Sequence, residues 1–135
     1  MIFVDTNILI DIATGNRAWA DWSRQAIVAA HARGPLLINA IVYAEFAIGF
    51  EAQPDCDAEI EKLDLTLAEI PKSAAFRAAQ AFRLYRCAGG ARTAALPDFF
   101  IGAHASVAGA TLLTRDARRY RAYFPELTLV APDGE

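Results

Sequence analysis

Short apolar runs recur along the chain, separated by longer segments in which apolar residues return every three or four positions. Each run is only three or four residues long, and glycine or proline stands within two residues of most of them, a pattern typical of short buried strands. The predicted strands cover residues 2–4, 36–38, 67–70, 111–113 and 127–130.

The segments between these strands have helical spacing. Asn39 is a suitable N-cap for one helix, and another has Pro97 near its start and Gly109 just past its end. The predicted helices cover residues 8–12, 18–33, 40–50, 55–65, 73–87, 97–108 and 116–123. Strands that alternate with helices need crossover connections. We therefore expect a single domain over residues 1–135, an α/β/α sandwich of three layers with a mainly parallel sheet of about five strands.

Composition narrows the class of protein. The chain has 135 residues, of which 55% are hydrophobic and 21% charged, so wholesale disorder is excluded. With 13 basic and 16 acidic residues the net charge is −3, which excludes a DNA-binding protein that relies on bulk positive charge, although not a local basic patch. Cys56 and Cys87 lack the spacing of a zinc site, and no secretion leader or membrane-length apolar stretch is visible. We expect a cytoplasmic protein with no membrane contact.

Common catalytic signatures are missing from the sequence. It contains neither a P-loop nor a dinucleotide-binding glycine motif, and no G-x-S-x-G nucleophile motif. The two histidines, His31 and His104, have no obvious serine or cysteine partner, and His104 is interpreted as structural. The candidate chemistry therefore rests on carboxylates.

Two carboxylates stand in unusual surroundings. Asp5 directly follows the first predicted strand, at the carboxyl end where open parallel sheets place their sites. Capping of the next helix would explain Asp5 as well, but Thr6 and Asn7 beside it are able to orient a ligand carboxylate. Glu45 is the only charged residue of an otherwise apolar helix, 40–50, which predicts burial and hence an ion pair, a neutral carboxyl or a metal.

Two further carboxylates also lie at the end of a predicted strand or at the start of a predicted helix. Asp98 lies in the first turn of its predicted helix, and Asp116 follows the strand 111–113. Favourable helix-dipole or capping interactions account for each one alone. If the first and fourth strands are neighbours, however, all four acids meet at one sheet edge, where only cations make such a cluster tolerable. Oxygen ligands favour Mg²⁺ or Mn²⁺, and such a site suits phosphodiester hydrolysis by one or two ions.

Three stretches of the sequence resemble the signature blocks of PIN-domain proteins, and specifically of VapC-type toxins from VapBC toxin–antitoxin systems. They are VDTNILID, NAIVYAEFAIGF and LPDFFIGAHASVAGATLLTRDARRYRAYFP. The resemblance extends over essentially the whole chain, to about Leu129. One departure is Pro97, which stands where many relatives have an asparagine before the third acid.

The resemblance implies a fold with parallel strands in the order 3-2-1-4-5 and an Mg²⁺- or Mn²⁺-dependent endoribonuclease toxin that cuts cellular RNA, such as tRNA or rRNA. It also implies a VapB-type antitoxin as inhibitor and a homodimer. Carried over residue by residue, it makes four acids catalytic and metal-binding and two polar residues supporting. The acids are Asp5, Glu45, Asp98 and Asp116, and the supporting residues are Asn7 and Thr114.

Arginines and tryptophans supply secondary candidates. Arginines near the fourth acid, namely Arg115, Arg118 and Arg119, suit RNA phosphates, but a solvated helix face with ion pairs fits them as well. A weaker group contains Arg83, Arg86 and Arg92. Trp19 and Trp22, one turn apart, either pack in the core or form part of a groove for an antitoxin helix.

Two alternatives to a nuclease are compatible with the same sequence features. The first is a non-catalytic PIN-fold module that binds RNA or protein, although all four acids are retained. The second is a phosphoryl-transfer or receiver domain, which needs an Asp-x-Asp motif or a well-placed lysine. The segment Asp5-Thr6-Asn7 and the two lysines, Lys62 and Lys72, fit that class poorly.

Overall fold

The computed structural model describes residues 1–90 and 95–132. Its sheet has five strands, all parallel, in the order β3-β2-β1-β4-β5. This confirms the predicted α/β class, the parallel sheet and the strand order. The strands are β1 (Ile2–Val4), β2 (Leu36–Ile38), β3 (Leu65–Leu67), β4 (Thr111–Leu113) and β5 (Thr128–Val130).

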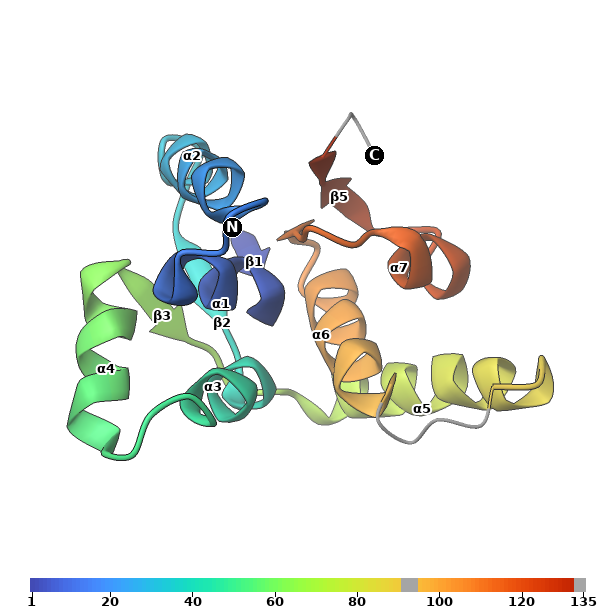
Figure 1. Ribbon diagram of the computed structural model, residues 1–135. Helices are drawn as coiled ribbons and strands as arrows, with labels where there is room; N and C mark the ends of the chain where they lie inside the picture. Colours follow the sequence, from blue (N-terminus) through green and yellow to red (C-terminus); the bar gives the residue numbers. More distant parts are fainter. Residues whose placement is uncertain (91–94, 133–135) are drawn as a thin grey trace.

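The helices pack around this sheet in two groups that follow the chain (Figure 1). Helices α1 to α4 lie on the side of β2 and β3, and α5 to α7 gather on the side of β4 and β5. The helices are α1 (Thr6–Thr14), α2 (Ala20–His31), α3 (Ala40–Ala47), α4 (Gln53–Lys62), α5 (Lys72–Cys87), α6 (Leu96–Val107) and α7 (Arg118–Tyr123). No helix among the described residues is both long and apolar enough to cross a membrane.

The two groups meet at β1 and β4, where the chain order of the strands reverses. Residues Ile2 and Val4 are in register with Thr111 and Leu113. The backbone N–H of Asp5 continues the pairing by donating to the Leu113 carbonyl over 2.9 Å. Such a switch point leaves a crevice at the carboxyl ends of the two strands, and that crevice receives Asp5 and Thr114.

The predicted position of the third strand is wrong. We expected residues 67–70 because they end at Pro71, but β3 is Leu65–Leu67. Asp64 adopts a positive φ of 54°, which turns the chain directly into the strand. The Ala68 amide still donates to the Ile38 carbonyl, so the pairing extends one residue beyond the strand. Predicted helix ends differ from the observed ones by at most three residues.

The expectation that the helix around Glu45 is buried on all sides is also wrong. Within α3 only Val42 and Phe46 are buried, and Ile48 just beyond it is 85% exposed. The apolar composition of this segment therefore reflects a core-facing side together with a second apolar side that faces an open groove, described below.

The contact between α6 and α7 depends on a glycine. A Cβ at Gly102 would lie 2.7 Å from Phe124 Cε2 and 3.0 Å from Tyr120 Cδ1. Phe124 is 1% exposed, so its ring has no room to move away.

We predict that Gly102→Ala destabilises the fold by about 1–3 kcal/mol, because overpacking outweighs the gain in helix propensity. Urea unfolding measures the change. Gly49→Ala is the control, since its added Cβ would meet nothing closer than the Phe46 carbonyl at 3.7 Å. Equal stability of the two variants would show that the α6–α7 contact is not tight.

Candidate active site

Asp5 is the most deeply placed of the four acids. It follows β1 and serves as the N-cap of α1, where its Oδ1 accepts a hydrogen bond from the Thr6 amide over 2.7 Å. Capping therefore does occur, as the alternative reading of the sequence allowed. Its other oxygen, Oδ2, accepts hydrogen bonds from the hydroxyls of Thr114 at 2.8 Å and Tyr120 at 2.9 Å. The side chain is thus held rigidly, with donors on both oxygens.

The surroundings of Asp5 change its acidity. Asp5 is only 5% exposed. Burial, and next the negative charge of Asp98, raise the pKa of Asp5 to about 6, while the hydrogen bonds from Thr114, Tyr120 and Thr6 oppose that rise. A carboxyl that is hard to ionise because of burial and, next, of a second carboxyl nearby marks a candidate functional site.

Glu45 reaches the same region from α3. The Thr6 hydroxyl donates to Glu45 Oε1 over 2.7 Å, so Thr6 contacts Asp5 through its amide and Glu45 through its hydroxyl. Burial raises the pKa of Glu45, and the hydrogen bond from Thr6 opposes this effect. Within the described residues no arginine forms an ion pair with Glu45.

Asp98 and Asp116 complete the set from the C-terminal half of the chain. Asp98 lies in the first turn of α6 and forms an ion pair with Arg119 of α7. Burial raises the pKa of Asp98, and the hydrogen bond from Arg119 opposes that rise. Asp116 is exposed in the segment between β4 and α7, where its amide donates to the Thr114 hydroxyl.

All four acids line one cavity of about 820 Å³, together with Asn7, Arg118, Arg119 and Tyr120. The oxygen-only donor set suits a hard divalent cation. The acids are gathered around the cavity but not in contact: in the part of the chain that the structure describes, no three acidic, histidine or cysteine side chains lie close enough to hold an ion together. The donor chemistry therefore fits such a cation, while the tight cluster that the sequence suggested is looser here.

The arginines considered as RNA contacts have different surroundings. Arg115 is paired with Asp11, and Arg119 with Asp98. Arg118 lines the acidic cavity and, with Asp116 and Arg121, an adjoining hollow of about 560 Å³. Of the weaker group, Arg83 and Arg86 lie on the exposed side of α5, and Arg92 is outside the described residues.

Sequence reasoning missed two residues that shape the site. Tyr120 appeared only as part of a helical pattern, and nothing in that pattern pointed to Asp5. Asp11 is buried on α1, four residues after Asn7 and so on the same helix face. Its acidic side chain within the apolar run 8–12 was an available signal, of the same kind that drew attention to Glu45.

The remaining predicted residues have structural surroundings. The buried His104 ring contacts Phe3 and hydrogen-bonds Asn39 through Nδ1 over 3.1 Å, as expected for a structural histidine. The Trp19 and Trp22 rings pack edge to face, with centroids 6.1 Å apart.

An apolar groove of about 750 Å³ lies between α1, α2, α3 and α4, beside the acidic cavity. Neither Trp19 nor Trp22 lines it. Val28 of α2, which is 70% exposed, and Ile48 contribute to its wall, and Arg24, Glu59 and Lys62 lie at polar positions along it. Ile10, Glu45 and Ile48 line both the groove and the acidic cavity, so the two are continuous.

Comparisons with known proteins give a consistent result. The family model of the PIN domain matches residues 2–125. A chain of VapBC2 from Rickettsia felis, solved bound to a promoter DNA fragment, is similar with a TM-score of 0.73 and 20% identity over 97% of this chain and 98% of that one. A chain of a toxin–antitoxin complex from Klebsiella pneumoniae has a TM-score of 0.71 and 26% identity over the full length of both. A chain of VapBC-1 from nontypeable Haemophilus influenzae has a TM-score of 0.70 and 21% identity over 97% and 98%. The comparison with curated proteins finds no match.

The hydrogen bond from Tyr120 generates a prediction about Asp5. In Tyr120→Phe the ring is kept but the donor to the carboxylate is lost, so the pKa of Asp5 should rise above its value of about 6. We expect an increase of about 1 unit, equivalent to about 1.4 kcal/mol. Carbon-13 NMR titration of the Asp5 carboxyl in chelator measures it.

Tyr123→Phe is the matched control, because Tyr123 lies on the same helix and lines the same cavity without a hydrogen bond to Asp5. An unchanged Asp5 titration in Tyr120→Phe would contradict the assigned role of this hydroxyl.

Proposed function

The chain belongs to the PIN domain family, and on that basis we propose that it is a metal-dependent endoribonuclease of the VapC toxin type. The observation that carries the proposal is the gathering of Asp5, Glu45, Asp98 and Asp116 around one cavity at the switch point of the sheet. Mg²⁺ or Mn²⁺ is the proposed cofactor, as one or two ions held by these four acids. The proposed substrate is cellular RNA, with tRNA or rRNA expected from the family resemblance, in the cytoplasm.

Residues of the chain itself hold the proposed ligand Asp5 in the fixed orientation that metal-dependent hydrolysis needs. Thr6, Thr114 and Tyr120 hold the Asp5 carboxylate in one orientation, which supports its role as a ligand rather than a mobile surface group. Asn7 donates weakly to Asp5 and Thr114, at 3.5 and 3.4 Å. These contacts support the proposed positioning roles of Asn7 and Thr114.

A bound divalent cation supplies Lewis acidity, which lowers the pKa of water and offsets the charge of the scissile phosphodiester. Arg118, at the border of the acidic cavity and the adjoining hollow, is suited to contact a flanking phosphate. The overall negative charge of the protein makes such local positive groups necessary for RNA binding.

We further propose that the partner is a VapB-type antitoxin. It places an amphipathic helix in the apolar groove between α1, α2, α3 and α4. The exposed apolar side chains of Val28 and Ile48 support this, since grooves of this kind receive the apolar face of a helix. The resemblance to a chain of the Klebsiella pneumoniae toxin–antitoxin complex supports the same partner class. A homodimer is expected from the family resemblance. Analytical ultracentrifugation measures the oligomeric state.

The nuclease proposal predicts that Asp98→Asn strongly slows RNA cleavage and weakens Mn²⁺ binding. We expect a loss of roughly 10²–10³-fold in rate, comparable with removing one electrostatic stabiliser of a transition state. Isothermal titration with Mn²⁺ and gel assays of RNA cleavage measure the two effects.

The control for this variant is Asp55→Asn. Asp55 also lies in the first turn of a helix with proline at its start, but no residue of α4 lines the cavity, so it shares only the helix-dipole role of Asp98. A parent protein that binds no Mn²⁺ and cuts no RNA would favour the non-catalytic PIN-fold module. Full activity in Asp98→Asn would remove Asp98 from the site.

The partner proposal predicts that Val28→Glu weakens antitoxin binding by at least about tenfold, or 1.4 kcal/mol, because a charge enters an apolar contact. RNA cleavage by this variant should persist when the antitoxin is added. Leu84→Glu, at an exposed apolar position of α5 outside the groove, is the control. Equal antitoxin affinity of Val28→Glu and the parent would exclude this groove.

A further inference from the structure

An ion pair between the buried Asp11 and the half-buried Arg115 lies outside the lining of the acidic cavity. Arg115 Nε donates to Asp11 Oδ2 over 2.7 Å, and Arg115 Nη2 donates to Asp11 Oδ1 over 2.9 Å. The planar fork of the guanidinium thus matches both carboxylate oxygens, the geometry in which arginine is most specific. Asp11 is 1% exposed, and the hydroxyl of the buried Ser23 donates a third hydrogen bond to it over 3.0 Å.

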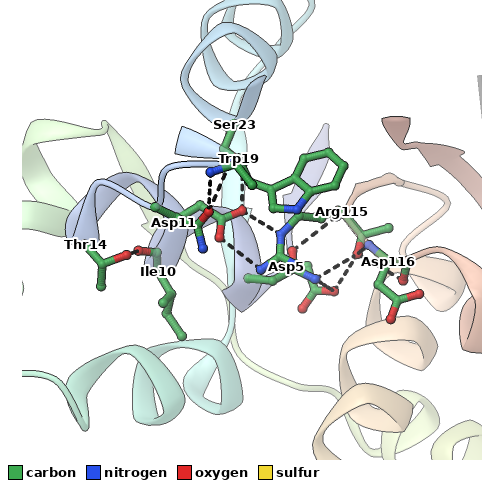
Figure 2. A network of polar contacts seen from close by, with 12 residues as sticks. Asp5, Ile10, Asp11, Thr14, Trp19, Ser23, Arg115 and Asp116 are labelled. Atoms are coloured by element: carbon green, nitrogen blue, oxygen red, sulfur yellow. Dashed lines mark hydrogen bonds and ion pairs between the residues drawn. The ribbon is translucent and has the colours of Figure 1, made fainter. Parts of the chain in front are cut away.

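Arg115 also contacts an aromatic ring that is not part of this ion pair. Its guanidinium carbon lies 5.6 Å from the centre of the Trp19 ring, within cation–π distance. Figure 2 shows Asp11, Ser23 and Arg115 joined by dashed lines, with the Trp19 ring beside the guanidinium. The contacts come from α1, from the start of α2 and from the segment after β4, where Arg115 follows Asp11 by 104 residues.

Helix α1 therefore holds Arg115 at two points. Asn7 Oδ1 accepts a hydrogen bond from the Arg115 amide over 3.2 Å, and Asp11, one turn further along, binds the side chain. The residues on either side of Arg115 are Thr114, which donates to Asp5, and Asp116, which lines the acidic cavity. Arg115 thus connects the segment that contains both neighbours to α1.

This arrangement leaves Arg115 poorly suited to RNA. Two of its donors are used by Asp11, and turning the side chain toward a phosphate would leave the Asp11 carboxylate buried without a positive partner. The phosphate contact that the sequence suggested for Arg115 is better supported for Arg118, which lines the cavity.

We propose that the Asp11–Arg115 pair is a positioning device that holds the Thr114–Asp116 segment against α1 and thereby sets the affinity of the acidic cavity for its divalent cation. The proposal rests on the proposed function, because it concerns the same site. Neither residue touches RNA or the cation; both act through the neighbours of Arg115.

The test compares Asp11→Asn, Arg115→Gln and the double variant with the parent protein. Mn²⁺ affinity is measured by isothermal titration, and RNA cleavage is measured at saturating Mn²⁺. We expect each single variant to bind Mn²⁺ about tenfold more weakly, at the lower end of what is typical when support of a metal ligand is lost. The double variant should bind no more weakly than the singles, because both remove one interaction. The KM for RNA should stay unchanged in all three.

A control and a milder variant keep the test decisive. Asp21→Asn breaks the exposed Arg24–Asp21 ion pair on α2 and should leave Mn²⁺ affinity unaltered. Ser23→Ala removes only the third hydrogen bond to Asp11 and should give a smaller loss in the same direction, which provides a measurement if Asp11→Asn fails to fold. Near-ultraviolet circular dichroism verifies that each variant is folded at the temperature of titration.

The outcomes separate this inference from the proposed function. A higher KM in Arg115→Gln with unchanged Mn²⁺ affinity in Asp11→Asn would make Arg115 an RNA contact and overturn the inference. Lower unfolding free energy with parent-like Mn²⁺ affinity would reduce the pair to a purely structural role and also overturn it. In both cases the parent still binds Mn²⁺ and cleaves RNA. A parent that binds no Mn²⁺ would instead refute the proposed function, and the inference with it.

Discussion

A carboxylate buried where β1 and β4 separate is the constraint around which the rest of the site is arranged. Asp5 cannot leave this position, because its amide extends the pairing of the two strands and its side chain caps α1. The pKa of about 6 exceeds the ordinary 3.8, so the cation-free protein loses stability as the pH rises through this interval, by on the order of 3 kcal/mol at neutral pH. The hydroxyls of Thr114 and Tyr120 limit that cost without removing it. A positive ion in the cavity would favour the ionised form of Asp5 and so offset this loss of stability.

The α/β class and the parallel sheet were predictable because local patterns and global topology agree, whereas the strand order followed from the resemblance to PIN-domain proteins. Apolar runs such as Ile2–Val4, bounded by polar residues or glycine, leave few alternatives to buried parallel strands. The exceptions have local causes: the positive φ of Asp64 moved β3, and the open groove beside α3 made an apolar helix look like a buried one. Neither cause is visible in hydrophobic periodicity.

The candidate site was predictable only in part. Strand ends and a lone acid in an apolar helix pointed to Asp5 and Glu45, since those signals are local. The partners of Arg115 and Arg119 were not predictable, because Asp11 and Asp98 are 104 and 21 residues away and pairing at that range follows from tertiary packing. Two arginines four positions apart thus contact carboxylates on different sides of the site. Charge clusters in a sequence indicate where ion pairs form, but not which ones.

The wide separation of Asp5 from its donors has a consequence for biosynthesis. Thr114 and Tyr120 follow it by 109 and 115 residues, so a ribosome exposes the first acid long before it makes the hydroxyls that orient it. A chain released early therefore carries Asp5, Glu45 and even Asp98 without an ordered site. The complete arrangement therefore forms only after Tyr120 has been made, 115 residues after Asp5.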